Sequence, residues 1–143
     1  MSGAGHVPSD ASSLSRVLAL DHGETRCGCA ISDPSGTLVR PLAAIEPDPA
    51  RVGELVAVHE VEMVVVGLPV SLDGEEGKQA RMARDFAAEL ERRLEVPVET
   101  YDERLTTKMA ERSEREGARA DRDSLAAAHL LEGYLASRRG ASF

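Results

Sequence analysis

The acidic residues that could do chemistry in this chain are Asp21, Asp102, Glu103 and Asp123. Asp21 ends the apolar run VLAL, and a carboxylate is costly to bury there unless another group pairs with it or binds to it. Asp102 and Glu103 follow a second run, VPVETY. Adjacent side chains of an extended segment diverge, so only one of these two can face a common site. Asp21 therefore predicts a binding site, with an ion pair to Arg26 or Arg104 as the structural alternative.

Asp123 has two interpretations that the sequence leaves open. It heads a helical stripe with the spacing i, i+4, i+7 and i+11, made of Asp123, Ala127, Leu130 and Tyr134. On that stripe Asp123 would point toward the sheet. Aspartate is also a favoured N-cap residue, and an N-cap at this position would need no binding role. Asp102 and Glu103 can likewise belong to a simple turn before the next helix.

The elements that position these residues follow from apolar patterning and turn signals. We expect strands at 17–21, 27–32 and 37–45, the last at a sheet edge because it contains Pro41. Two more strands are expected at 61–68 and 96–101. Helices are expected from 48 through 58, from about 76 to 94, from 106 or 107 to about 116, and from about 123 to 137. This order predicts an α/β fold with a mixed five-stranded sheet, three antiparallel strands and then two parallel ones, flanked by helices.

The strand order brings three separate segments to one edge of this sheet. Ligands of such folds collect outside the carboxyl ends of the parallel strands, where the first and fourth strands adjoin. Asp21, the GLP segment at 67–69, and Asp102 with Glu103 all fall at these ends. The edge is therefore the expected place of a functional site.

Length and composition limit the class of protein. The 143 residues fit one domain, expected at 16–138, between a polar tail at 1–15 and a short tail at 139–143. No stretch approaches the roughly 20 apolar residues of a membrane span, and the N-terminus does not resemble a signal peptide, so a cytoplasmic protein is expected. Cys27 and Cys29 are expected to be small core residues. The net charge of −8 counts against broad, non-specific binding to nucleic acid.

Four segments resemble the signature segments of the YqgF (RuvX-like) family of RNase H-fold nucleases: LALDHGETRCGCAISD, VVVGLPVSLDGEEGKQARMARDFAAEL, YDERLTT and DSLAAAHLLEGYL. They cover about residues 16–136 in the family's order. The first segment alone is weak, because sugar kinases and chaperone ATPases share its phosphate-binding turn; its combination with GLP and DERLTT is specific. The resemblance implies an RNase H-like fold and a metal-dependent phosphodiester hydrolase. It further implies 5′-end processing of pre-16S rRNA during ribosome biogenesis.

The resemblance assigns catalytic and metal-binding roles to Asp21, Glu103 and Asp123 by position. Two Mg²⁺ or Mn²⁺ ions about 3.5–4 Å apart would activate a water and stabilise charge on the attacking and leaving oxygens. Carboxylate oxygens suit these ions, and their mutual repulsion predicts a raised pKa for at least one carboxyl group. The expected contacts to the nucleic-acid backbone are Lys78, Arg104, Thr106, Lys108 and Arg119. A solvated helix face is the alternative for the cations, and helix capping is the alternative for the threonine.

Two residues beside Asp21 depart from the family pattern. Glu24 stands where a small hydroxyl residue is usual, and it adds a carboxylate that could contact metal indirectly or weaken the approach of phosphate. His22 stands where an aromatic or aliphatic residue is usual. It could transfer a proton, but an isolated histidine beside a strand end is more often structural.

Alternative functions stay open. A Holliday junction resolvase of DNA recombination or repair would require a dimer that presents two sites, and the chain leaves monomer or homodimer undecided. A non-catalytic RNA-binding factor of ribosome assembly is an alternative of another class. An ATP-binding fold ranks below both, because one domain lacks the second lobe that closes over a nucleotide. The expected partners are pre-rRNA, branched DNA or ribosomal particles, and no membrane.

Overall fold

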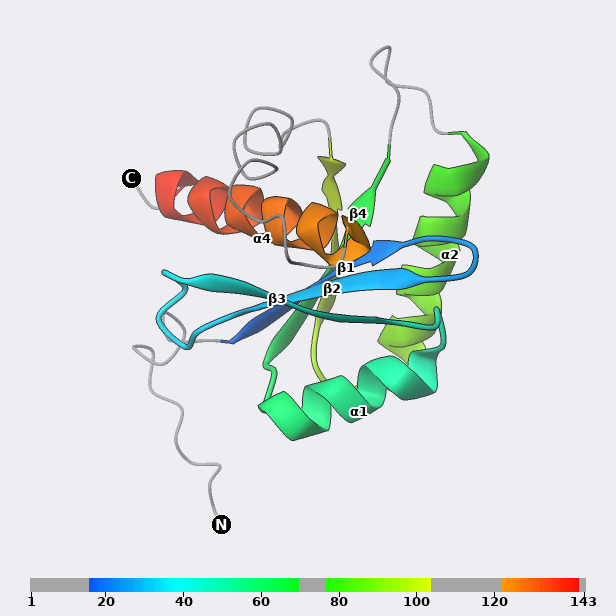
Figure 1. Ribbon diagram of the computed structural model, residues 1–143, viewed down its shortest axis with the longest axis horizontal. Helices are drawn as coiled ribbons and strands as arrows, with labels where there is room; N and C mark the ends of the chain where they lie inside the picture. The colour runs from blue at the N-terminus through cyan, green and yellow to red at the C-terminus, as the bar shows by residue number, and fades with distance from the viewer. Residues whose placement is uncertain (1–15, 70–76, 104–121, 142–143) are drawn as a thin grey trace.

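Five strands form one mixed sheet in the order β3-β2-β1-β4-β5. The computed structural model describes residues 16–69, 77–103 and 122–141. β1 (Val17–His22), β2 (Cys27–Ser32) and β3 (Val39–Ile45) form an antiparallel meander, while β1 pairs in parallel with β4 (Met63–Leu68), and β4 pairs in parallel with β5 (Val98–Asp102). This order places β3 and β5 at the two edges, and Figure 1 shows α4 and α1 on opposite sides of β1 and β2. The predicted mixed sheet is confirmed, including the edge position of the strand that contains Pro41.

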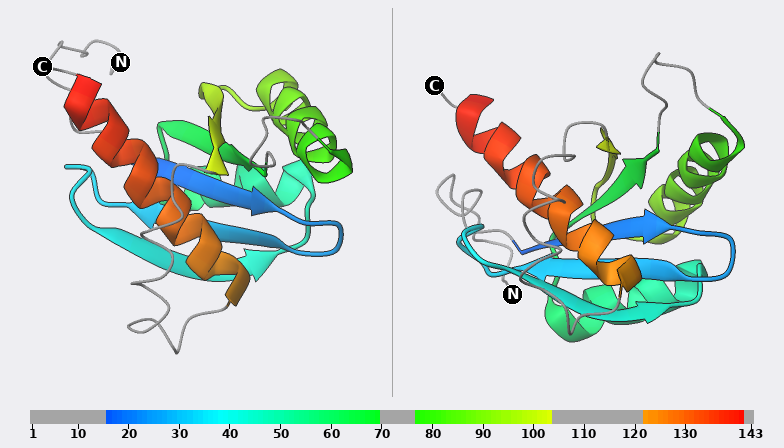
Figure 2. Two further views of the ribbon diagram at one scale, coloured as in Figure 1. Left: turned by 90° about the horizontal axis from the view of Figure 1, so that it is seen from above. Right: turned by 45° about the horizontal axis from the view of Figure 1, so that its top comes forward.

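Helices cover both faces of this sheet. α1 (Pro49–His59) and α2 (Lys78–Arg93) lie on one face, and α4 (Arg122–Ala141) crosses the other, as the turned views of Figure 2 show. The helix predicted from 106 or 107 to 116 lies outside the described residues. No helix in the ranges 16–69, 77–103 and 122–141 has the length and hydropathy to cross a bilayer.

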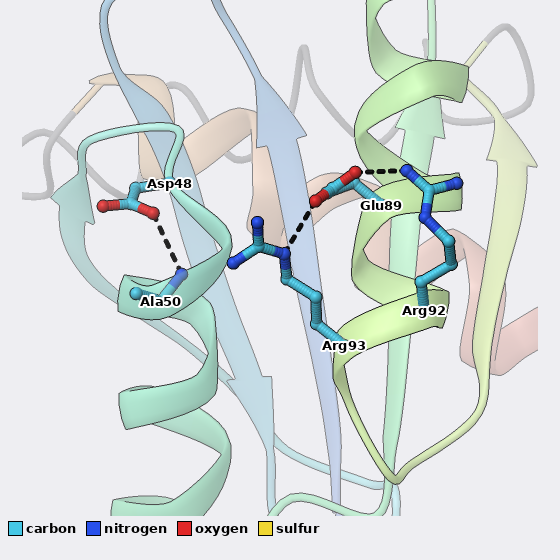
Figure 3. A network of polar contacts seen from close by, with 5 residues as sticks. All are labelled: Asp48, Ala50, Glu89, Arg92 and Arg93. Atoms are coloured by element: carbon cyan, nitrogen blue, oxygen red, sulfur yellow. Dashed lines mark hydrogen bonds and ion pairs between the residues drawn. The ribbon is translucent and has the colours of Figure 1, made fainter.

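The first helix begins at the predicted cap, and the second begins at Lys78, about two residues after its predicted start. Asp48 caps α1: its Oδ1 accepts a hydrogen bond of 3.0 Å from Ala50 N, ahead of a proline in the first turn. On the exposed side of α2, Glu89 accepts hydrogen bonds from Arg92 and Arg93 one turn later (Figure 3). Such exposed ion pairs contribute little to stability, because solvent screens them. Burial of the other side of α2 therefore accounts for most of its stability.

The sheet separates two apolar cores. The core under α1 and α2 is built on large aliphatic residues of the strands, among them Leu18, Leu20, Ile31 and Val66. Cys27 and Cys29 belong to this core and form no disulfide, which confirms their prediction as small core residues. The core under α4 has smaller residues, and its members are Val17, Ala19, Ala30, Val65, Ala127, Ala128, Leu130, Leu131, Tyr134 and Leu135.

Three strands begin two residues later than the apolar pattern predicts, at Val39, Met63 and Val98. Val61 illustrates the reason. It is buried, with 4% of its surface exposed, but it lies before β4, and its N–H donates to Val56 O of α1 and not to a neighbouring strand. Apolar patterning reports burial and not membership of the hydrogen-bonded ladder. At the other end of the chain, α4 continues to Ala141, beyond the predicted end near 137.

Candidate functional site

Asp21 and Glu103, two of the three candidate carboxylates that the structure describes, belong to rows of side chains on the α4 face of the sheet. In β1, Val17 and Ala19 pack in the core under α4, and side chains two residues apart along a strand share a face. Asp21 continues this row. In β5, Tyr101 packs against the same core, and Glu103 follows two residues later. Strand alternation therefore explains why both acidic groups reach the same side of the sheet.

Gly67 leaves the space in which Glu103 approaches Asp21. The parallel register of β1, β4 and β5 places Asp21, Gly67 and Tyr101 level across the three strands. A Cβ atom at position 67 would lie 2.5 Å from Glu103 Oε2 and 3.0 Å from Leu130 Cδ2 of α4. The first of these distances is too short for any real side chain, so a larger residue here would displace the Glu103 carboxyl group.

Glu103 and Asp21 form a hydrogen-bonded carboxyl pair. Burial, the negative charge of Asp21, the hydrogen bond between the two groups and the charge of Asp102 together raise the pKa of Glu103 to about 8. At neutral pH, Glu103 therefore keeps its proton and donates it to the Asp21 carboxylate, because two adjacent carboxylates that are partly shielded from water cannot both be ionised cheaply. The prediction that at least one carboxyl group of the site has a raised pKa is confirmed for Glu103.

The donor set of this pair fits a divalent cation. A cation between the two carboxyl groups would replace the shared proton and would supply the positive charge that the pair lacks. Within the described ranges, no group of three or more His, Cys, Asp or Glu side chains is placed to hold a metal ion. The third predicted ligand, Asp123, lies in the first turn of α4, but its side chain is outside the described part of the structure.

The helix that carries Asp123 packs as the sequence predicts. Ala127, Leu130 and Tyr134 are all at most 5% exposed, so the predicted stripe does face the sheet. Leu130 lies against Gly67, which brings this stripe directly over the β4 residue next to the carboxyl pair. Asp123 occupies the next position of the same stripe toward the N-terminus of the helix.

Of the residues predicted to contact the nucleic-acid backbone, the structure describes only Lys78. Its Nζ lies 3.7 Å from Glu24 Oε2, and both side chains are more than half exposed. Glu24, the extra carboxylate beside Asp21 in sequence, is therefore on the turn between β1 and β2 and pairs with the first residue of α2. The other predicted contacts, Arg104, Thr106, Lys108 and Arg119, lie outside the described residues.

His22 lies on the opposite face of the sheet from Asp21. Its ring packs against Phe86 of α2, with 4.7 Å between the ring centres, and burial lowers its pKa. The buried Nδ1 has no hydrogen-bond partner within the described part of the chain. A neutral ring that faces α2 supports the structural interpretation of His22 over a role in proton transfer.

Two residues of this region were not predicted as site residues. Gly67 interrupts the β-branched run VVV in β4, and a glycine within a strand is a known signal of close approach by another group. Ser124 is completely buried in the first turn of α4, where its Oγ accepts a hydrogen bond of 3.1 Å from Cys29 N of β2. Nothing in its sequence position distinguishes it from a helix-capping serine.

Comparison with known proteins identifies the family of this chain. The sequence model of the RuvX family, described as Holliday junction resolvase, matches residues 15–137. A protein of Roseiflexus sp. (strain RS-1) named "Putative pre-16S rRNA nuclease" is 39% identical over 135 residues, which span 87% of this chain and 96% of the relative. A protein of the same name from Chloroflexus aurantiacus is 41% identical over 134 residues, with 86% and 88% of the two chains covered.

Among solved structures, RuvC of T. thermophilus in complex with a Holliday junction substrate superposes with a TM-score of 0.65. The alignment covers 88% of this chain and 96% of RuvC at 17% sequence identity. An identity this low supports a shared fold alone. The match to the family model and the two relatives carry the assignment further: the chain belongs to the RuvX (YqgF) family of nucleases and has a RuvC-like RNase H fold.

Proposed function

We propose that this chain is a cytoplasmic, metal-dependent nuclease that hydrolyses phosphodiester bonds in structured RNA, with the 5′ region of pre-16S rRNA as its substrate. The observation that carries the proposal is the carboxyl pair of Asp21 and Glu103 at the carboxyl ends of β1 and β5. Acidic pairs that are partly shielded from water are unfavourable for folding, so the presence of this pair supports a functional role. The names of the two relatives support the choice of substrate.

In this proposal, Asp21, Glu103 and Asp123 hold one or two Mg²⁺ or Mn²⁺ ions. Bound ions would activate the attacking water and stabilise charge on the leaving oxygen. Glu103 must lose its proton to become a ligand, which its pKa of about 8 allows once a cation is near. Gly67 keeps the approach of Glu103 open, and the buried Leu130 of α4 packs against Gly67 beside it.

Because the chain is acidic, substrate binding is expected to depend on a few Lys and Arg side chains near the site. With a net charge of −8, a general attraction to RNA is not expected. Backbone contacts are proposed for Lys78 in α2 and for Arg104, Thr106, Lys108 and Arg119, which flank the carboxyl pair in the sequence. A ribosomal particle that presents the precursor is the partner that this limited binding surface favours.

A Holliday junction resolvase is the second candidate. It is supported by the description of the family model and by the RuvC fold neighbour, which binds a four-way junction. Resolution of a junction requires two sites that act together, so this alternative predicts a homodimer. A non-catalytic assembly factor would bind the precursor without any cleavage.

One experiment separates the three candidates. The purified protein is incubated with 5′-extended 16S rRNA precursor or with a four-way DNA junction, each with Mg²⁺, Mn²⁺ or EDTA. The nuclease proposal predicts metal-dependent shortening of the RNA. Asp21→Asn should lower the rate about 1,000-fold, which corresponds to the several kcal/mol that metal-held charge stabilisation contributes.

Asp48→Asn is the matched control, because it makes the same chemical change at a helix cap where asparagine serves equally well. This control should cleave like the wild type. Binding without cleavage under every metal would contradict the proposal in favour of the assembly factor. Cutting of the junction alone, by a dimer, would favour the resolvase.

A further inference from the structure

Ser124 joins α4 to β2 through a buried polar contact. Its side chain is 0% exposed, and its Oγ lies 3.1 Å from the backbone nitrogen of Cys29, a residue 95 positions away in sequence. At this point the pairing of β2 with β3 shifts its register between Cys27 and Cys29. Such an irregularity disrupts the strand ladder locally. The serine hydroxyl gives the Cys29 N–H a partner there and fixes the first turn of α4 on the sheet.

The hydrogen bond between Ser124 and Cys29 limits the rotation of α4 about its axis. Two rows of residues along the helix face different strands, so a rotation would move both rows away from their partners. The row of Ser124 faces β2 and the turn after it, where Leu135 Cδ2 would be 3.8 Å from a Cβ atom on Gly36. The neighbouring row faces β4 and β5: Leu130 lies against Gly67, and the Tyr134 hydroxyl donates to Glu99 at 2.9 Å. By helical spacing, position 123 belongs to this second row.

We infer that Ser124 is a positioning residue that fixes the first turn of α4, and with it the backbone position of Asp123, on the sheet. The inference rests on the proposed function, in which Asp123 is a metal ligand. Asp123 directly precedes Ser124 in the chain, so a hydrogen bond that holds Ser124 on β2 also fixes the backbone of residue 123. Without this bond, the first turn of α4 can rotate or fray, and position 123 moves with it.

Tyr134 provides a matched control at the other end of the same helix. Its hydroxyl contacts Glu99 Oε1 and Met63 Sδ, so it also ties α4 to the sheet through a polar contact. It lies 11 residues from Asp123, roughly 16 Å along the helix axis. Loss of this hydroxyl should loosen α4 without rotating its first turn.

The test measures binding of Mn²⁺ itself, by calorimetric titration of the full chain, for the wild type, Ser124→Ala, Ser124→Thr and Tyr134→Phe. Ser124→Ala should weaken Mn²⁺ binding about 10- to 100-fold, the range observed when partners of metal ligands are removed. Ser124→Thr keeps the hydroxyl and should bind Mn²⁺ nearly as well as the wild type. Tyr134→Phe should lower the urea midpoint of unfolding and leave Mn²⁺ affinity unchanged.

Any other result of this titration contradicts either the positioning role of Ser124 or the proposed metal-dependent function. Wild-type affinity in Ser124→Ala, or equal weakening in Tyr134→Phe, contradicts the positioning role alone. Absence of Mn²⁺ binding in the wild type overturns the proposed metal-dependent function and the positioning role together. If circular dichroism shows that Ser124→Ala does not fold, Ser124→Cys replaces it, because a thiol fills the same space but accepts hydrogen bonds weakly.

Discussion

The two faces of the sheet use alternate residues of the same strands for different purposes. Toward α1 and α2, β1 presents Leu18, Leu20 and His22, and the ring of the histidine packs on α2. Toward α4, the same strand presents Val17 and Ala19, followed by Asp21. On the α1/α2 face, the row of β1 side chains therefore ends with a packed histidine ring. On the α4 face, the row ends with a carboxylate.

The difference in side-chain size explains why the site forms on only one of these faces. Small residues such as Ala19, Ala30 and Gly67 allow α4 to lie close to the sheet, so its first turn reaches the level of the carboxyl pair. The other face buries larger side chains, and area buried from water is the main source of stability. We conclude that both faces contribute a packed core to the fold, and that the α4 face in addition bears an acidic pair that opposes folding.

The largest expected effect on stability is on the α1/α2 face. Leu18→Ala removes a fully buried side chain and should lower the free energy of unfolding by about 2–5 kcal/mol. The specific activity of the folded fraction should be unchanged, because the site lies on the other face. Urea unfolding and a cleavage assay below the transition check both parts. A loss of activity greater than the loss of folded protein would break the distinction between the faces.

Gly67→Ala should affect metal binding more than it affects stability. Its new Cβ atom would lie 2.5 Å from Glu103 Oε2, so the Glu103 carboxyl group must move, at a cost of about 1–3 kcal/mol in stability. We expect a fall in Mn²⁺ affinity of about 10- to 100-fold, comparable to other disturbances of a ligand's surroundings.

Gly53→Ala is the control for this change. Gly53 lies within α1, where a Cβ atom would meet Leu94 Cδ2 at an ordinary 3.7 Å. Alanine is the better helix former by about 1 kcal/mol, so this variant should be more stable than the wild type and bind Mn²⁺ equally. Similar behaviour of the two alanine variants would show that Gly67 has no special relation to Glu103.

The carboxyl pair should make stability depend on pH in the metal-free protein. The pKa of Glu103 is raised from 4.5 to about 8 in the folded chain, so between these values the folded state holds a proton that the unfolded state has released. Stability must then fall as pH rises from 4.5 to 8, by at most about 1.4 kcal/mol per pH unit, and level off above that range. Glu103→Gln removes this dependence. Parallel curves for wild type and variant in urea titrations with EDTA would refute the raised pKa.

The smallest effect is expected at His22. Its ring packs on Phe86, and its buried Nδ1 has no hydrogen-bond partner among the described residues. His22→Phe keeps a ring of similar shape and removes that polar atom, so stability should stay equal or rise by up to about 1 kcal/mol. Cleavage should be unaffected across the pH range. A large loss of activity near neutral pH would revive the interpretation of His22 as a proton-transfer group.

The sequence predicted which strands carry the acidic residues, because strand order and alternation follow from apolar patterning and connection rules. Asp21 and Glu103 could be placed at one edge on that basis, and the family resemblance selected Glu103 over Asp102. The GLP segment could be placed at the same edge, but the contact of Gly67 with Glu103 could not be predicted, since it depends on the distance between β4 and a side chain that follows β5. Ser124 was missed for a similar reason: its partner is a backbone group of β2, and a backbone donor leaves no signature in residue types.

The contact between β5 and α4 has a practical consequence. The chain contains two tyrosines and no tryptophan, and Tyr101 and Tyr134 meet edge to face with ring centres 5.6 Å apart. The Tyr101 hydroxyl also donates to Gly133 O of α4. The tyrosine fluorescence of the protein therefore arises entirely at the junction between this helix and the sheet. Emission will report detachment of α4, whereas far-ultraviolet circular dichroism reports the whole backbone, and any separation of the two transitions would reveal a state in which α4 has left a still-folded sheet.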